Sequence, residues 1–264
     1  MSGDFKIDVT RGDSPLVLAQ PHSGTWIPES IHSRLNDLGQ EISDTDWHIP
    51  RLYEGLVDNV TIVTTPVHRY VVDANRDPSG ESLYPGQNTT GLCPLTTFDG
   101  DSIYVDGQQP SQDEIESRQS QYHQPYHDAI REELDRVHQK HGYVILYDCH
   151  SIRSVVPYLF ENVLPDFNIG TNSGASCASE IQQMVETTCK AASQYKTVSN
   201  ARFKGGWTTR HYGQPEKGFH SIQMELAQST YMIETAPWTY LDNEAENLRQ
   251  VLKRFLTGLT TVLD

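Results

Sequence analysis

Three short apolar segments of this sequence each deliver a polar side chain that could bind a metal ion or move a proton. The segments are residues 16–19, 143–147 and 221–224, and the polar residues at or just beyond their carboxyl ends are His22, His150 and Glu225. Continuous apolar runs of this length are typical of strands buried in a parallel sheet. Because ligands of such sheets bind at the carboxyl ends of the strands, we expect the three polar residues to meet there.

Two histidines and a carboxylate are the ligand set of a hydrolytic zinc ion that keeps one position open for water. We therefore predict that His22 and His150 bind one divalent metal ion, with Zn²⁺ as the best match. Residues 44–48, "DTDWH", offer the third ligand. Asp46 is our first choice because it directly precedes the periodic part of an expected helix, followed by Asp44 and then His48. Either aspartate could instead cap that helix.

Two further carboxylates lie beside these ligands in the sequence. Asp148 is two residues before His150, so on a strand both side chains point the same way. It could orient the imidazole through its second ring nitrogen, bind the metal itself, or cap the next loop. Glu225 stands in an otherwise apolar segment, where burial would raise its pKa and suit it to act as a general base. A buried salt bridge is the alternative for Glu225.

Arginine residues collect in the segments that follow the expected strands. The guanidinium fork matches a carboxylate, so the group predicts a small acidic substrate, although each arginine could instead form a surface ion pair. Paired glycines in "RFKGGW" would let the backbone approach such a ligand closely. The residues that we predict to bind substrate are Asn75, Arg76, Arg153, Arg202, Gly205, Gly206 and Arg210; Arg69 belongs to the same group of arginines.

Composition restricts the class of protein. The net charge of −15 argues against nucleic acid as the main partner. No segment approaches the roughly 18 apolar residues that span a membrane, and the start has no apolar signal segment. The four cysteines form no CxxC pair, which indicates reduced thiols in a cytoplasmic protein. We expect residues 1–264 to form a single domain, and the sequence does not indicate its oligomeric state.

Helical and apolar segments alternate along the chain, which predicts an α/β fold with three layers and a mostly parallel central sheet. Strands are expected at 16–19, 60–66, 69–77, 143–148, 195–200 and 220–228, and helices at 44–59, 111–141, 176–193 and 243–263. We expect residues 77–110, 151–174 and 202–213 to be mainly loops.

The expected helix at 111–141 contains several local signals. Ser111 and Glu114 form a capping box, Gly142 ends the helix, and Pro125 should kink or split it. His123 and His127 have the i, i+4 spacing of a metal-binding pair. No glutamate follows the first histidine, and Pro125 distorts the turn, so we do not predict a metal site there.

Longer strings of the sequence resemble the N-formylglutamate amidohydrolase (deformylase) family of the histidine-degradation pathway. The resemblance covers nearly the whole chain and is carried by "PHSG", "DTDWHIPRLY", "NRDPSGESLYPGQNTTGLCP", "DCHSIRS", "LPDFNIGTNSGASC", "RFKGGWTTRHYG" and "ELAQSTYM". It implies a fold similar to zinc carboxypeptidases and aspartoacylases, with a mixed sheet flanked by helices. It also implies hydrolysis of N-formyl-L-glutamate to L-glutamate and formate.

The resemblance implies roles for individual residues. His22 and His150 match the first and last zinc histidines, and Glu225 matches the general base. Asn75 and Arg76 resemble the Asn-Arg pair that grips substrate in aspartoacylases, and Arg76 could also stabilise the oxyanion. Thr25 stands where those relatives have the glutamate of an HxxE motif, so Asp46 is the expected substitute. The alternatives are a zinc deacylase for another N-acyl amino acid and a non-catalytic binder of acidic metabolites.

Overall fold

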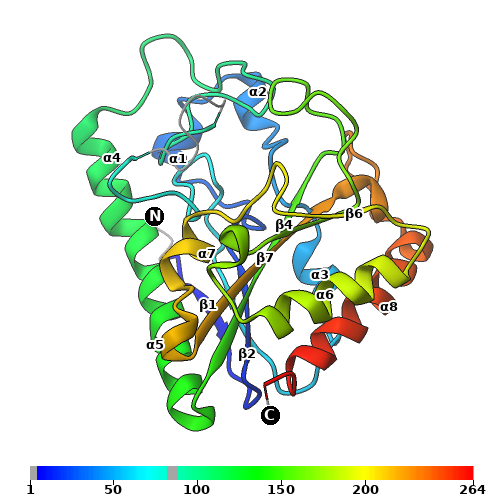
Figure 1. Ribbon diagram of the computed structural model, residues 1–264. Coiled ribbons are helices and arrows are strands. Elements are labelled where there is room, and N and C mark those ends of the chain that lie inside the picture. The colour runs from blue at the N-terminus through cyan, green and yellow to red at the C-terminus, as the bar shows by residue number, and fades with distance from the viewer. Residues whose placement is uncertain (1–4, 82–88, 264) are drawn as a thin grey trace.

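The computed structural model describes residues 5–81 and 89–263, and its centre is a seven-stranded sheet (Figure 1). In spatial order the strands are β1 (Asp8–Thr10), β3 (Thr61–Thr64), β2 (Leu16–Gln20), β4 (Val144–Ile152), β7 (Phe219–Ala227), β5 (Phe167–Gly170) and β6 (Thr197–Ser199). Strands β2, β3, β4 and β7 run parallel, β1 is antiparallel to β3, and β5 is antiparallel to β7 and parallel to β6. The predicted mixed, mostly parallel sheet is confirmed.

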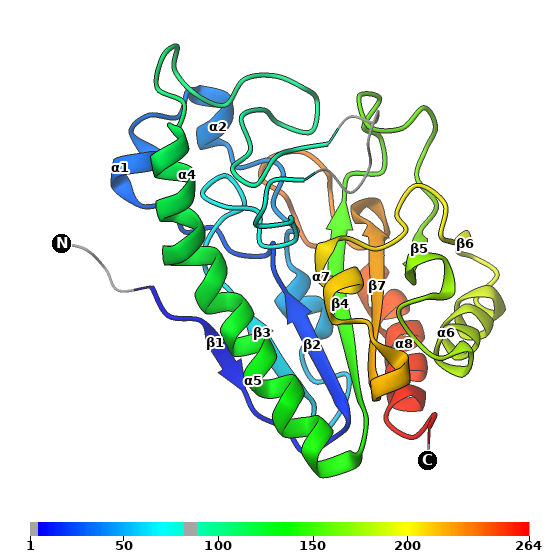
Figure 2. The same cartoon turned by 60° about the vertical axis from the view of Figure 1, so that its left-hand side comes forward.

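Helices cover both faces of the sheet and complete three layers (Figures 1 and 2). Side chains alternate along β2: Leu16 and Leu18 pack with α3, α6 and α8, whereas Val17 and Ala19 pack with α5. Burial on both faces explains why the central strands read as continuous apolar runs. The α-helices are α1 (Glu29–His32), α2 (Asp37–Gln40), α3 (Ile49–Tyr53), α4 (Gln112–Arg118), α5 (Gln124–His141), α6 (Ser179–Ala191), α7 (Trp207–Tyr212) and α8 (Asp242–Leu259).

The expected helix at 111–141 forms without a break. The Ser111 hydroxyl accepts a hydrogen bond from the Glu114 backbone N–H, and Gly142 ends α5 with a positive φ of 80°. Pro125 does not split the helix, because a π-helical turn, Gln119–His123, joins α4 to α5 directly before it. A wider turn accommodates the ring and the missing N–H of a proline without ending the helix.

Two predicted elements are wrong in extent. Residues 69–77 form turns rather than a strand. Residues 70–74 are all buried, as in a central strand, but none of them pairs with the sheet. The expected helix at 44–59 is helical at α3 alone. Residues 44–48 form turns, in which His48 has a left-handed φ of 62°.

The structure also corrects two predicted loops and the predicted end of one strand. Strand β5 lies within the expected loop at 151–174, and α7 lies within the expected loop at 202–213. Strand β4 continues to Ile152, four residues beyond the expected end at Asp148, so His150 belongs to the strand rather than to the segment after it. The described parts of 77–110 contain no helix or named strand, and residues 82–88 lie outside the described structure.

In the part of the chain that the structure describes, no helix has the length and apolar character needed to cross a membrane. The four cysteines are buried and form no disulfide.

Substitution of Leu252 tests the packing of α8 on the sheet. This side chain is fully buried in the cluster that joins α8 to β2, β4 and β7. We expect Leu252→Ala to lower the free energy of unfolding by about 2–5 kcal/mol, because it removes apolar contact and leaves a cavity. The neighbouring exposed Lys253→Ala is the control and should change it by less than about 0.5 kcal/mol in urea unfolding. Equal effects of the two variants would contradict this packing.

Candidate metal centre and active site

The carboxyl ends of β2, β4 and β7 meet at one edge of the sheet. These strands are parallel neighbours, with Ala19 beside Asp148 and His150 beside Glu225. His22 follows β2 by two residues. Since residues Asp148, His150 and Glu225 belong to the strands themselves, the sheet register fixes their relative positions.

His22, Asp46 and His150 form a buried cluster whose ligand atoms all lie within 4.8 Å of one another. The Nδ1 atoms of the two histidines are 3.2 Å apart. Oδ2 of Asp46 lies 3.2 Å from Nδ1 of His150 and 3.8 Å from Nδ1 of His22. Tetrahedral ligands of zinc are separated by about 3.3 Å when each is 2.0–2.1 Å from the ion. The spacing therefore fits one metal ion.

The hydrogen bonds of the outer ring nitrogens also favour a cation between these residues. Nε2 of His22 lies 2.7 Å from Oδ1 of Asp73, and Nε2 of His150 lies 2.9 Å from Oδ2 of Asp148. A carboxylate accepts, so each Nε2 donates its hydrogen. When both imidazoles are neutral, as metal binding requires, the two Nδ1 lone pairs point at each other and at Asp46. Three converging electron donors are the arrangement that a metal ion requires.

Asp46 is the third member of the cluster, rather than Asp44 or His48. Arg69 donates to Oδ1 of Asp46 at 2.9 Å, and the Ser151 backbone N–H donates to Oδ2 at 3.1 Å. Asp44 instead accepts from the Tyr70 hydroxyl and the Phe98 N–H, both at 2.8 Å. Nε2 of His48 is 2.6 Å from the Trp238 carbonyl. Neither aspartate side chain caps α3.

Glu225 lies beside His150 and is 7% exposed. Its Oε2 accepts a 3.4 Å hydrogen bond from Gln223, and it forms no ion pair within residues 5–81 and 89–263. Burial raises the pKa of Glu225 to about 8. A carboxyl group with that pKa is suited to exchanging a proton near neutral pH.

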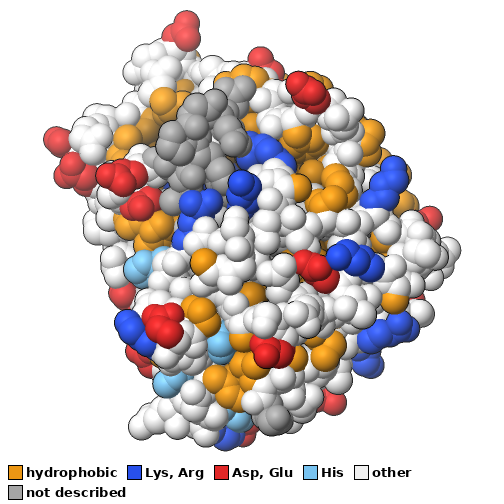
Figure 3. All heavy atoms as spheres, in the orientation of Figure 1, with side chains coloured by type: hydrophobic (Ala, Val, Ile, Leu, Met, Phe, Trp, Pro, Cys, Tyr) orange, Lys and Arg blue, Asp and Glu red, His pale blue; other side chains and the backbone are white. Residues whose placement is uncertain are grey.

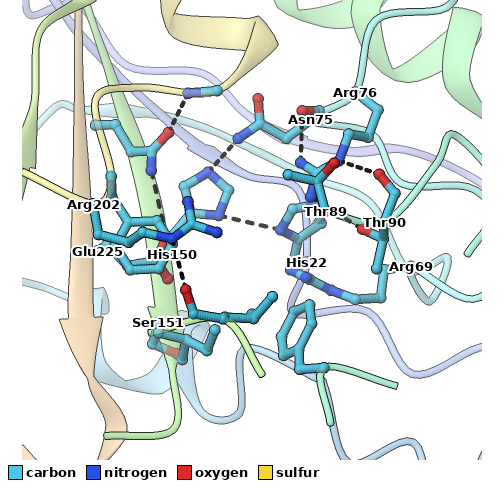
Figure 4. A pocket seen from close by; sticks show the side chains of 16 residues that line it. His22, Arg69, Asn75, Arg76, Thr89, Thr90, His150, Ser151, Arg202 and Glu225 are labelled. Atoms are coloured by element: carbon cyan, nitrogen blue, oxygen red, sulfur yellow. Dashed lines mark hydrogen bonds between the residues drawn. The ribbon is translucent and has the colours of Figure 1, made fainter. Parts of the chain in front are cut away.

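A pocket opens onto the metal cluster and Glu225 (Figure 4). Three arginines line it: Arg202 lies on one side of the two imidazoles, and Arg69 and Arg76 lie on the other. Arg153 and Arg210, which we predicted to bind substrate, are not among the described lining residues. Arg153 forms an ion pair with Asp99 at 2.7 Å.

Gly206 lines the pocket, but a contact within the protein, rather than with a ligand, explains why this position has no side chain. A Cβ at this position would lie 2.4 Å from the side-chain amide of Asn75. Asn75 Nδ2 lies beside His150 and donates to Oδ2 of Asp148 at 3.4 Å, and its Oδ1 accepts from the Thr208 N–H at 2.9 Å. Gly205 has a positive φ of 106°. The two glycines thus allow the backbone to lie against Asn75.

Comparison with known proteins agrees with this arrangement. The sequence model described as N-formylglutamate amidohydrolase matches residues 14–232. The chain belongs to this family. An N-formylglutamate deformylase of Pseudomonas putida is 43% identical over 257 residues, covering 97% of this chain and 96% of that protein. One of Pseudomonas aeruginosa is 45% identical over 258 residues, with the same coverage.

Solved structures show that the fold is shared more widely. The crystal structure of N-formylglutamate amidohydrolase from Ralstonia eutropha aligns with a TM-score of 0.79 at 23% identity, covering 96% of both chains. A protein from Agrobacterium tumefaciens aligns with a TM-score of 0.72 at 17% identity, covering 98% of this chain and 96% of that one.

Our sequence analysis did not name Asp73 as part of the site, and it named Arg69 only as one of a group of arginines. Asp73 holds His22, and Arg69 holds Asp46 while lining the pocket. Asp73 ends the apolar run at residues 70–72, as Asp148 ends the run at 143–147. The same pattern, an aspartate at the end of an apolar run, could therefore have identified Asp73. Arg69 had no local signal that separated it from the other arginines.

Replacement of Asp73 tests whether the carboxylate behind His22 supports metal binding. We expect Asp73→Asn to weaken zinc affinity about 10- to 100-fold, because the neutral amide polarises the imidazole less. Competition with a chromophoric chelator measures this affinity. Asp99→Asn, which removes an exposed partner of Arg153, is the matched control and should leave it unchanged. Unaltered affinity in Asp73→Asn would remove Asp73 from the metal site.

Proposed function

We propose that this chain is an N-formylglutamate deformylase, which hydrolyses N-formyl-L-glutamate to L-glutamate and formate. The observation that carries the proposal is the buried His22, Asp46 and His150 cluster beside Glu225, facing a pocket with three arginines. The relatives at 43–45% identity, named as deformylases, support the same substrate. The reaction belongs to histidine degradation, as the family resemblance implies.

We infer that His22, Asp46 and His150 hold one Zn²⁺ ion. When bound, such an ion polarises the formyl carbonyl and lowers the pKa of a bound water toward about 7. Asp73 and Asp148 keep the two imidazoles in the tautomer that leaves Nδ1 free to bind. Arg69 and the Ser151 N–H hold Asp46 so that its Oδ2 faces both histidines.

Glu225 moves the proton in the proposed reaction. Its carboxylate takes a proton from the attacking water as the new C–O bond forms at the formyl carbon. It then delivers that proton to the leaving nitrogen as the C–N bond breaks, which releases L-glutamate and formate. The buried position of Glu225, which raises its pKa, favours both transfers.

The arginines supply the positive charge for an anionic substrate. Arg69 is buried, contacts Asp46 and has no described hydrogen-bond partner at Nε, so it is placed to stabilise charge on the formyl oxygen. Arg76 and Arg202 flank the imidazoles and are our candidates for binding the two substrate carboxylates (Figure 4). Figure 3 shows a small group of basic side chains on one face of a chain whose net charge is −15.

Asn75 has a supporting role in this proposal, because its amide donates to Asp148, the carboxylate that holds His150. Arg153 and Arg210 lie outside the pocket lining, so we give them no direct contact with substrate. The proposal also treats residues 1–264 as one domain that acts in the cytoplasm.

Formate release is the first test of the proposed function. Protein loaded with zinc should release one formate per N-formyl-L-glutamate consumed, measured with a coupled formate dehydrogenase assay. Chelation should abolish the release and zinc should restore it, because the water needs the ion for activation. N-acetyl- and N-succinyl-L-glutamate, tested alongside, should react much more slowly.

Each other outcome selects a different function. Preferential hydrolysis of another acyl group would replace the substrate and keep the zinc chemistry. Binding of N-formyl-L-glutamate without hydrolysis by the zinc-loaded, folded protein would indicate a binder of acidic metabolites.

Glu225→Gln tests the general base. The variant should bind zinc normally, whereas kcat should fall about 10²- to 10⁴-fold because the amide cannot accept the proton. Glu133→Gln is the matched control: Glu133 is equally buried but pairs with Arg136 on α5, away from the pocket. A kcat close to wild type in Glu225→Gln would exclude Glu225 as the base.

A further inference from the structure

The segment from Tyr70 to Arg76 serves the site in three ways without being part of a helix or strand. Asp73 holds His22, Asn75 contacts His150, and Arg76 lines the pocket. A turn segment lacks the repeating hydrogen bonds of regular structure, so other groups must fix its backbone. Those groups come from the helix that runs from α4 into α5.

Three side chains of this helix contact backbone carbonyls of the segment. Arg118 donates to the Val71 carbonyl at 3.2 Å. Nε2 of His127 lies 2.8 Å from the Ala74 carbonyl, and Nε2 of His123 lies 3.1 Å from the Arg76 carbonyl. The two histidines therefore bind the carbonyls on either side of Asn75.

The two imidazoles lie side by side on the helix. Residues four apart on an α-helix are neighbours on one face, and the ring centroids of His123 and His127 are 4.3 Å apart. The segment opposite them is a turn, in which the Arg76 N–H donates to the Asp73 carbonyl at 3.2 Å. This turn places the Ala74 and Arg76 carbonyls within hydrogen-bond distance of the histidine pair.

The protonation state of both rings suits this contact. A carbonyl accepts only, so each Nε2 must donate its hydrogen. Burial lowers the pKa of both His123 and His127, which favours the neutral imidazole. Nδ1 of His127 then accepts from the Tyr212 hydroxyl, 3.0 Å away.

The π-helical turn explains how Arg118 joins the same contact surface. Its hydrogen bonds span five residues, so residues five apart lie almost above one another. Arg118 and His123 are five apart across this turn, and His127 follows one α-helical turn later. In an uninterrupted α-helix, a separation of five residues would rotate Arg118 by about 140° from His123.

We propose that His123 and His127 are positioning residues for the hydrolytic site. His127 fixes the backbone before Asn75, whose amide donates to the Asp148 carboxylate that holds His150. His123 fixes the Arg76 carbonyl, which sets the guanidinium in the pocket. This deepens the proposed function and rests on it for the role of Arg76. Neither histidine touches substrate or metal, so their effects must pass through Asn75 and Arg76.

Paired amide substitutions of His123 test whether this residue affects substrate binding. Gln reaches about as far as Nε2 of histidine and keeps a donor there, whereas the shorter Asn does not. We expect His123→Asn to lower kcat/KM for N-formyl-L-glutamate about five- to tenfold, mainly through KM. His123→Gln should stay within about twofold of wild type.

The same substitution in an Arg76→Ala background separates positioning from general stability. If His123 acts through Arg76, His123→Asn should change kcat/KM less than about twofold once Arg76 is absent. An equal loss in both backgrounds, or equal activity of the Asn and Gln variants, would overturn the role of His123. Thermal unfolding of every variant reports whether the fold is kept.

His127 is tested by a readout that does not depend on turnover. His127→Asn should weaken zinc affinity relative to His127→Gln in chelator competition, because a displaced Asn75 no longer holds Asp148, the partner of His150. Equal affinities would overturn the role of His127. If wild-type protein releases no formate, the proposed function fails, and the zinc affinities of the His127 pair still decide the positioning proposal.

Discussion

The site depends on how buried negative charge is compensated. Asp46, Asp73 and Asp148 are at most 1% exposed, and Glu225 is 7% exposed. These four carboxylates lie around the imidazoles of His22 and His150. Removing so many carboxylates from water is unfavourable unless cations and hydrogen bonds replace the solvent. Arg69 supplies one buried positive charge, and the imidazole N–H groups supply directed hydrogen bonds. Three features bring these oppositely charged groups together: the parallel strands, the glycines beside Asn75 and the turn at residues 70–76.

Much of this arrangement could be predicted from the sequence, because it follows from local rules. A parallel sheet brings strand ends together, so His22, His150 and Glu225 could be grouped from their positions alone. Asp46 was selected from three candidates in one short segment, and the structure places it with the two histidines. The limits appear where several consecutive residues are buried. Residues 70–74 resemble a strand in composition, yet they pack into the protein as turns, and no periodic pattern distinguishes the two cases.

Long-range pairing was beyond what the sequence could show. Whether an arginine serves a pocket or an ion pair depends on the partner that the fold brings to it. Arg153 meets Asp99, 54 residues away, whereas Arg69 meets Asp46 from a neighbouring loop. The same limit applied to the histidine pair in α5. Its spacing was visible, but the carbonyls it contacts lie about 50 residues earlier in the chain.

The distance along the chain between the metal ligands has a consequence for folding. His22 and His150 are 128 residues apart, and Asp46 and His150 are 104 apart. An unfolded chain therefore has no preformed site, and an ion that binds this cluster joins the first and middle parts of the polypeptide much as a cross-link would. Its binding free energy adds to the free energy of folding. Metal supply would then govern the lifetime of the folded protein in the cell as well as its chemistry.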